Sequence, residues 1–126
     1  MKADKADAAA FDMAELVRVA GGDTTLADEL AALFLGESSE HMSRISSAVN
    51  NSDGPALKFA AHALKGSAAS LTARAVAVIA GRLEEMGVAG DIAAAKSAFA
   101  QLANEMTALA GMLELLLLPK IPTVAA

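Results

Sequence analysis

Apolar residues recur every three or four positions along most of this sequence, which is the spacing of residues on one face of an α-helix. Five segments carry the pattern, at residues 13–20, 26–49, 57–71, 76–86 and 92–116. Glycines and short polar residues separate the segments, as expected of turns. We therefore predict one short N-terminal helix followed by four longer ones.

Residues that favour helix ends stand at the boundaries of these segments. Candidate caps, whose side chains accept backbone N–H bonds, are Asp23 or Thr24, Thr72 and Asp91. The expected ends are the Gly-Gly pair at 21–22, the turn at 50–55, Gly87 and Pro119. Phe11 is placed to staple the short first helix, which begins near Asp12. These boundaries leave residues 1–10 as a flexible lead and 119–126 as a C-terminal tail.

Each long segment has one apolar seam that must be buried against other helices. The seam of the second segment is Leu26, Leu30, Leu33, Phe34, Met42, Ile45 and Val49, and that of the third is Leu57, Ala61, Leu64, Ala68 and Leu71. Such helices with short connections pack most simply as an antiparallel up-and-down four-helix bundle. We predict this all-α fold for residues 11–118, with the short additional N-terminal helix across one end. The leucine run at 115–118 exceeds a one-sided stripe, so we expect part of it to be exposed or to contact a partner.

The composition suits one compact helical domain, since the chain has 126 residues, 55% of them hydrophobic and 3% aromatic. Its net charge of −5 disfavours nucleic acid and anionic membranes as partners, because both bind clustered Lys and Arg. The absence of cysteine excludes disulfides, thiolate catalysis and Cys-ligated zinc. The N-terminus lacks an apolar core of signal-peptide length, and the longest leucine run is too short to span a membrane. We therefore expect a cytoplasmic protein.

His62 is the residue on which the functional prediction rests. A helix places Lys58 and Phe59 one turn before it, places Lys65 and Gly66 one turn after it, and turns it away from the seam. A phosphoryl group on an imidazole carries close to two negative charges, so an ammonium one turn away lowers the free energy of the loaded ring. A glycine inside a helix lowers its stability, and close approach of a partner's backbone to His62 would explain Gly66.

Residues 61–71, Ala-His-Ala-Leu-Lys-Gly-Ser-Ala-Ala-Ser-Leu, closely resemble the signature of histidine phosphotransfer domains. That signature reads His, any residue, Leu, Lys, Gly, Ser, Ala, a variable pair, Leu, Gly. The resemblance implies that His62 is phosphorylated, that Lys65 stabilises the phosphoryl group, and that Gly66 keeps the docking surface open. It also suggests that Nε2 is the modified nitrogen, which the residues alone do not decide.

The resemblance extends over residues 11–118. Positions that the family fills with Leu, Leu, Leu and Glu are occupied here by Val76, Ile79, Leu83 and Glu84. Residues 33–35, Leu-Phe-Leu before a polar stretch, are similar to the family's second helix. Thr72 departs from the Gly that the family usually has, and this difference bears on the turn after the third helix rather than on the phosphorylated residue.

What the resemblance implies is a phosphoryl carrier rather than an enzyme. The sequence has no Gly-rich phosphate-binding loop ending in Lys-Ser/Thr and no acidic cluster for magnesium. The implied partners are receiver domains of a hybrid sensor histidine kinase and of a response regulator, and the receiver supplies magnesium and the acceptor aspartate. We expect a monomer without a cofactor of its own that relays phosphoryl groups in two-component signal transduction.

Several alternatives stay open. The chain could be the phosphate-accepting domain of a larger hybrid or chemotaxis-type kinase, or a helical-bundle interaction module that is not phosphorylated. A di-metal bundle enzyme would carry Glu three residues before an inward-facing His. Ser38 and Phe59 occupy those positions before His41 and His62, which argues against such a metal site.

The remaining polar residues have simpler interpretations. His41 is expected to be an ordinary helix histidine, because the branched Ile45 stands four residues after it, where His62 has Gly66. Five acidic residues are expected on solvated faces or as caps, namely Glu37, Glu40, Glu84, Glu85 and Asp91. Arg74 and Arg82 are candidates for a basic rim that meets the acidic receiver.

Overall fold

The computed structural model describes residues 11–118, so the predicted lead at 1–10 and the predicted tail at 119–126, which begins with Pro119, lie outside the described residues. Within the described range the chain forms helices and no strand. The helices are α2 (Met13–Val19), α3 (Thr24–Asn50), α4 (Gly54–Ser70), α5 (Arg74–Ala89) and α6 (Ile92–Leu117). The prediction of an all-α fold is confirmed.

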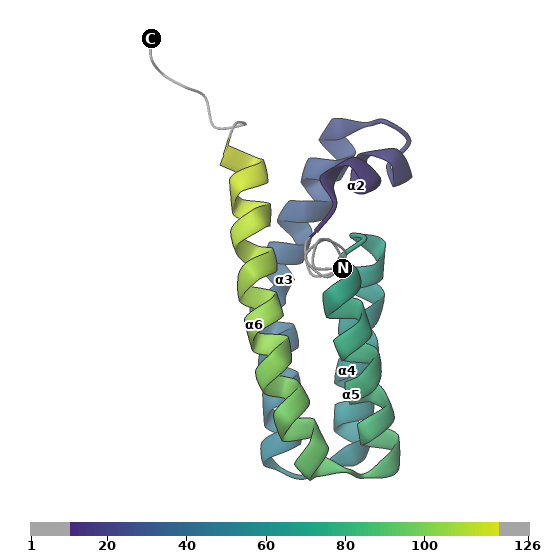
Figure 1. Ribbon diagram of the computed structural model, residues 1–126, viewed down its shortest axis with the longest axis vertical. Helices are drawn as coiled ribbons and strands as arrows, with labels where there is room; N and C mark the ends of the chain where they lie inside the picture. The colour runs from purple at the N-terminus through teal and green to yellow at the C-terminus, as the bar shows by residue number, and fades with distance from the viewer. Residues whose placement is uncertain (1–10, 119–126) are drawn as a thin grey trace, which may run out of the picture.

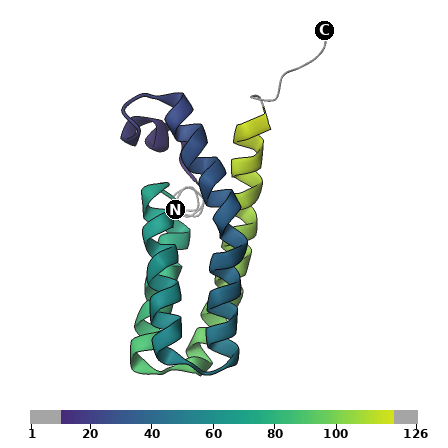
Figure 2. The ribbon, with the colours of Figure 1, turned by 180° about the vertical axis from the view of Figure 1, so that it is seen from behind.

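The four long helices lie side by side (Figure 1). Short turns join them at alternating ends, so helices that follow one another in sequence run in opposite directions. Each long helix packs against the next, and α6 also packs against α3. The short α2 lies at the end where α3 begins and α6 finishes, as the view from behind also shows (Figure 2). This order leaves α4 between α3 on one side and α5 on the other.

Aspartates begin four of the five helices within residues 11–118. Their carboxylates accept backbone N–H bonds of 3.0–3.1 Å from the first turn, at Asp12, Asp23, Asp53 and Asp91. The predicted cap at Asp91 is confirmed, and of the two candidates before α3 the cap is Asp23. Gly54 and Pro55, predicted as part of a turn, belong instead to the first turn of α4, where proline is well tolerated.

The prediction that Thr72 caps a helix is wrong. Ala73 occupies the N-cap position of α5, so no side chain caps that helix. Thr72 lies one residue earlier, where the turn requires a left-handed backbone with φ of +62°. Among the described residues, its buried hydroxyl oxygen has no hydrogen-bond partner. A glycine, which adopts this conformation without steric cost, would suit the turn better.

The prediction that Gly87 ends its helix is also wrong. The helix α5 continues to Ala89 and ends at Gly90, whose φ of +72° is left-handed. Gly87 is instead a contact point between helices, since an added Cβ would lie 2.7 Å from the backbone nitrogen of Lys58 and 2.8 Å from the carbonyl oxygen of Gly54. This close approach holds the backbone of α5 against that of α4.

The core follows the predicted seam closely in α4 and less closely in α3. All five predicted positions of α4 and its C-cap are buried, namely Leu57, Ala61, Leu64, Ala68 and Leu71. In α3 the prediction fails at Leu26 and Leu33, which are exposed, while Ala27, Ala31 and Phe34 are buried. Alanine lets neighbouring helices approach closely, so the buried line of α3 follows the small residues and leaves these leucines at its edges.

The leucine run at the end of α6 is partly exposed, as predicted. Leu115 and Leu118 face solvent, whereas Leu116 and Leu117 pack against the core. Each fully buried leucine of the bundle contributes about 1.5–3 kcal/mol of transfer free energy, so the exposed leucines add little to stability.

Candidate functional site

His62 lies in the middle of α4 and points away from the core. Leu57 and Leu64 on the same helix are fully buried and determine which face turns inward. The side chain of His62 is consequently 67% exposed. Its imidazole can therefore be reached by a partner from outside the bundle.

Glu84 on α5 joins His62 to Lys65. The Nδ1 atom of His62 lies 3.0 Å from Oε2 of Glu84, and Nζ of Lys65 lies 2.7 Å from Oε1 of the same carboxylate. The side chain of Glu84 is only 18% exposed, so the two helices shield its charge partly from water. The close packing of α4 against α5 thus brings together a histidine, an ammonium group and a carboxylate.

The Glu84 carboxylate determines which nitrogen of His62 carries the proton. An ionised carboxylate only accepts hydrogen bonds, so Nδ1 is the nitrogen that donates to Oε2. In the neutral ring the lone pair then lies on Nε2. Within residues 11–118, no group forms a hydrogen bond with Nε2. The arrangement therefore presents a nucleophilic nitrogen on an exposed ring.

The charge of Glu84 is itself stabilised by this contact. The hydrogen bond from Lys65 lowers the pKa of Glu84 most, burial of the carboxyl raises it, and the hydrogen bond from His62 and the nearby positive charges lower it further. The net result is a pKa below the ordinary value of 4.5. Glu84 consequently stays ionised, and keeps accepting the Nδ1 proton, over a wide pH range.

Gly66 has no side chain to project from the surface of α4 beside His62. It is exposed, and a Cβ added to it would meet no described atom within 4 Å. The fold itself therefore does not require a glycine at this position, and access to the surface remains as a reason for it. Lys58, the second lysine beside His62, is directed elsewhere, with Nζ 5.8 Å from the centre of the Phe59 ring.

Glu84 belongs to this cluster, whereas the sequence predicts it on a solvated face. It occupies a position where histidine phosphotransfer domains also have Glu. The structure places it between His62 and Lys65, which are both on the neighbouring helix. The family position was the available signal, because no helical spacing links residues on two different helices.

His41 has different surroundings. It is partly buried on α3, and its Nε2 lies 3.4 Å from the hydroxyl oxygen of Ser67 on α4. No carboxylate within the described residues forms an ion pair with it. The described contacts of His41 are those of a histidine packed between two helices.

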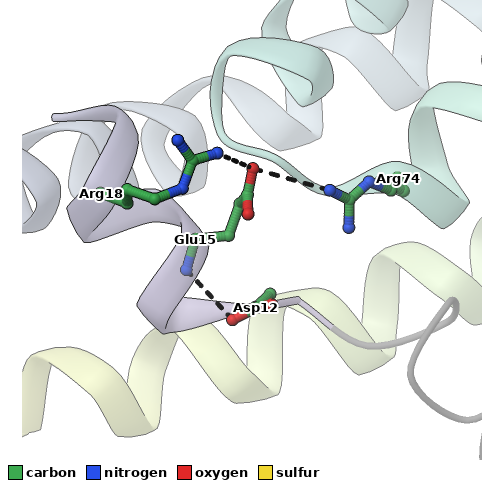
Figure 3. Close-up of polar contacts among 4 residues, drawn as sticks. All are labelled: Asp12, Glu15, Arg18 and Arg74. Atoms are coloured by element: carbon green, nitrogen blue, oxygen red, sulfur yellow. Dashed lines mark hydrogen bonds and ion pairs between the residues drawn. The ribbon is translucent and has the colours of Figure 1, made fainter.

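Arg74 lies apart from the His62 site. Figure 3 shows Oε2 of Glu15, on α2, between the guanidinium groups of Arg18 at 2.7 Å and Arg74 at 3.6 Å. Asp12 caps the same short helix. The ion pair therefore ties the start of α5 to α2, whereas Arg82, two positions before Glu84 on α5, is exposed.

Within residues 11–118 the structure contains neither a cluster of metal-ligating side chains nor a membrane-spanning helix. Among residues 11–118, no three His, Cys, Asp or Glu side chains come close enough together to hold a metal ion. In the same range, no helix has both the length and the apolar character needed to cross a membrane.

Comparison with known proteins identifies a domain family. A family model described as "Hpt domain" matches residues 29–112, which include the whole His62, Lys65 and Glu84 cluster. The chain has no match among curated proteins and none among solved structures.

Proposed function

This chain belongs to the Hpt domain family, and we propose that it carries a phosphoryl group on His62 between receiver domains. Membership of the family implies phosphotransfer in two-component signalling. In our proposal His62 accepts the group from the aspartate of one receiver, in a hybrid sensor histidine kinase, and passes it to the receiver of a response regulator. The observation that carries this proposal is the hydrogen bond from Nδ1 of His62 to Glu84, because it leaves Nε2 free to react.

The loading step requires no proton to leave the ring. The lone pair of Nε2 attacks the phosphorus of the receiver's aspartyl phosphate, and the N–P bond forms as the P–O bond to the aspartate breaks. The aspartate leaves with the bonding electron pair, while the Nδ1 proton stays on the ring. The phosphorylated ring of His62 then carries a positive charge, which the Glu84 carboxylate stabilises at 3.0 Å. Transfer to a second receiver reverses these changes.

Lys65 and Gly66 support this reaction in different ways. The ammonium of Lys65 is held 2.7 Å from Glu84 on a flexible stem, and it is partly exposed on the same side of α4 as His62. A small movement would bring it to a phosphoryl oxygen, where it would offset negative charge. Gly66 would let the receiver backbone come close to the ring.

We further propose that the domain is a monomer in the cytoplasm with the antiparallel up-and-down four-helix bundle expected from the sequence, including the additional N-terminal helix. It would need no cofactor of its own, and the magnesium ion of the reaction would lie in the receiver. The same site would serve equally well as the phosphate-accepting domain of a larger hybrid or chemotaxis-type kinase. A bundle that only binds partners would not need the Glu84 contact to His62.

Phosphotransfer to single-histidine variants tests the proposal. We expect a phosphorylated receiver to place acid-labile phosphate on the wild-type chain and on His41→Gln, and to leave His62→Gln unlabelled. The two variants are matched, because each removes one imidazole from one helix of the same bundle. Equal labelling of His62→Gln and wild type would contradict the assignment.

A further inference from the structure

Gly81 differs from the other glycines of the chain in what surrounds it. It lies inside α5, and a Cβ added to it would lie 3.5 Å from Cδ of Lys65 on α4. At each of the other glycines, the atoms nearest to an added Cβ belong to the backbone, or no described atom lies within 4 Å. A glycine inside a helix lowers its stability. Gly81 is therefore a candidate for a role that depends on the Lys65 side chain.

The Lys65 side chain crosses from α4 to α5 at this point. Its Nζ lies 2.7 Å from Oε1 of Glu84, which follows Gly81 by three positions and so shares its face of α5. The side chain is 41% exposed, so the protein covers much of it. Lysine commonly lays its methylene groups along a neighbouring surface while its ammonium reaches a polar partner. The bare backbone at Gly81 leaves room for these methylene groups beside Glu84.

The resting position of the ammonium matters because Glu84 has two hydrogen-bond donors. Lys65 binds Oε1, and Nδ1 of His62 lies 3.0 Å from Oε2. The hydrogen bond from Lys65 is the largest cause of the lowered pKa of Glu84, so the ammonium offsets part of the charge that the carboxylate offers to the ring. Within residues 11–118, the ring forms no other ion pair or hydrogen bond. Departure of Lys65 would therefore leave Glu84 to the ring alone.

Phosphorylation of His62 would bring a second anion within reach of this ammonium. A phosphoryl group carries close to two negative charges, whereas the Glu84 carboxylate carries one. Lys65 lies one turn after His62 on the same helix, and its flexible stem can move between α5 and the outer face of α4. The loaded ring would gain from both movements, since its phosphoryl group would bind the ammonium and its positive charge would face an unshared carboxylate.

Building on the function proposed above, we propose that Gly81 is a positioning residue, which leaves open the place where the Lys65 stem lies and lets the ammonium exchange between two anions. In the unloaded domain the ammonium rests on Glu84. In the loaded domain it binds the phosphoryl oxygens. Gly81 acts on the reaction only through Lys65, and a side chain larger than a methyl group at this position would displace the stem.

Titration of the Glu84 carboxyl group by carbon NMR in the unloaded domain tests the role of Gly81. We expect the pKa of Glu84 to rise in Gly81→Val, whose branched side chain would occupy the place of the stem, by as much as it rises in Lys65→Ala. Gly81→Ala should keep the wild-type pKa, because its Cβ makes only an ordinary contact at 3.5 Å. Gly111→Val on α6 is the matched control, since this helical glycine is exposed and an added Cβ meets no described atom within 4 Å.

A double variant shows whether Gly81 acts through Lys65. When Gly81→Val is combined with Lys65→Ala, the pKa of Glu84 should equal that of Lys65→Ala alone, because the stem is already absent. A wild-type pKa in Gly81→Val, or two shifts that add fully in the double variant, would overturn the role of Gly81. Neither measurement involves phosphorylation, so either result would leave the proposed function standing.

The exchange itself is tested on domains loaded with phosphoramidate, a small phosphoryl donor that needs no receiver. In mildly alkaline solution, where the acid-labile phosphate persists, the Glu84 carboxyl signal should differ between unloaded wild type and unloaded Lys65→Ala. The two signals should coincide once both domains are loaded. Loaded signals as far apart as the unloaded ones would overturn the exchange. A wild-type chain that neither phosphoramidate nor a phosphorylated receiver labels would overturn the proposed function and the exchange together.

Discussion

His62 and His41 have similar neighbours in sequence and different partners in space. Each is followed three positions later by a basic residue, Lys65 or Arg44. Lys65 reaches a carboxylate on the neighbouring helix that also binds His62, whereas Arg44 pairs with Glu40 on its own helix. The cation next to His62 therefore belongs to a shared cluster, and the cation next to His41 does not.

Two further differences separate the histidines. The partner on the neighbouring helix is Glu84 for His62 and Ser67 for His41. A hydroxyl can donate or accept a hydrogen bond, so Ser67 does not determine the tautomer of His41. Four positions after each histidine stands an open Gly66 or a buried Ile45. Both histidines have a basic residue three positions later, but only His62 also has a carboxylate from a second helix and an open surface beside it.

Of the three differences, loss of the Glu84 carboxylate should slow phosphotransfer most. In Glu84→Ala the ring of His62 loses its hydrogen-bond partner at Nδ1, so the ring proton can move to Nε2. Lys65 also loses its ion pair. We expect the rate of phosphotransfer from a receiver to fall about 10–100-fold, by analogy with the loss typical of carboxylates that orient metal-bound histidines. Single-turnover transfer kinetics would measure this.

The control for this variant is Glu85→Ala, which removes an exposed carboxylate from the next position of α5. It should transfer at the wild-type rate. If Glu84→Ala also kept the wild-type rate, the tautomer would not depend on Glu84 and the comparison with His41 would lose its main element.

Removing the Lys65 ammonium should slow phosphotransfer less than removing the Glu84 carboxylate. Lys65→Ala leaves the hydrogen bond between His62 and Glu84 in place and removes only the positive charge available to the phosphoryl group. We expect phosphotransfer to slow about tenfold, as one charge-assisted contact is lost. Helix content by circular dichroism should not change, because the ammonium is partly exposed, and Lys96→Ala on α6 serves as a control for charge alone. A large loss of helix content would mean that Lys65 is mainly structural.

Obstructing the surface beside His62 should slow phosphotransfer less again. Gly66→Leu adds a side chain where no described atom lies within 4 Å of the new Cβ, so the bundle can accept it. We expect stability to rise by up to about 1 kcal/mol, because glycine is a poor helix former. Transfer from a receiver should slow about fivefold through obstructed docking, whereas labelling by phosphoramidate should not change. Unchanged transfer from the receiver would refute the access role of Gly66.

The sequence predicted the elements that depend on local spacing. The seam of α4, the cap at Asp91 and the outward direction of His62 all follow from residues within one or two turns. One error arose where another helix decides the outcome. Gly87 was predicted to end a helix because glycine often does, yet it lies inside α5 where the backbone of α4 leaves no room for a Cβ.

The same limit applies to the candidate site. Lys65 and Gly66 could be placed beside His62 because they share its helix. Glu84 lies 22 positions from His62, and its contact depends on how far α5 is rotated and shifted against α4. Helical periodicity does not determine that register, so the sequence alone assigned Glu84 to a solvated face.

Stability measured against pH should give the smallest and most specific difference between the two histidine sites. The folded-state pKa of Glu84 is lowered, so its stabilising contribution is complete above its ordinary value of 4.5 and is lost as pH falls through the lowered pKa. Thermal unfolding of wild type and Glu84→Gln should therefore differ most above pH 4.5 and converge in stronger acid. Ser67→Ala, beside His41, changes no carboxylate and should run parallel to wild type through this range. A constant difference between wild type and Glu84→Gln down to strong acid would show that the Glu84 contact acts without its charge.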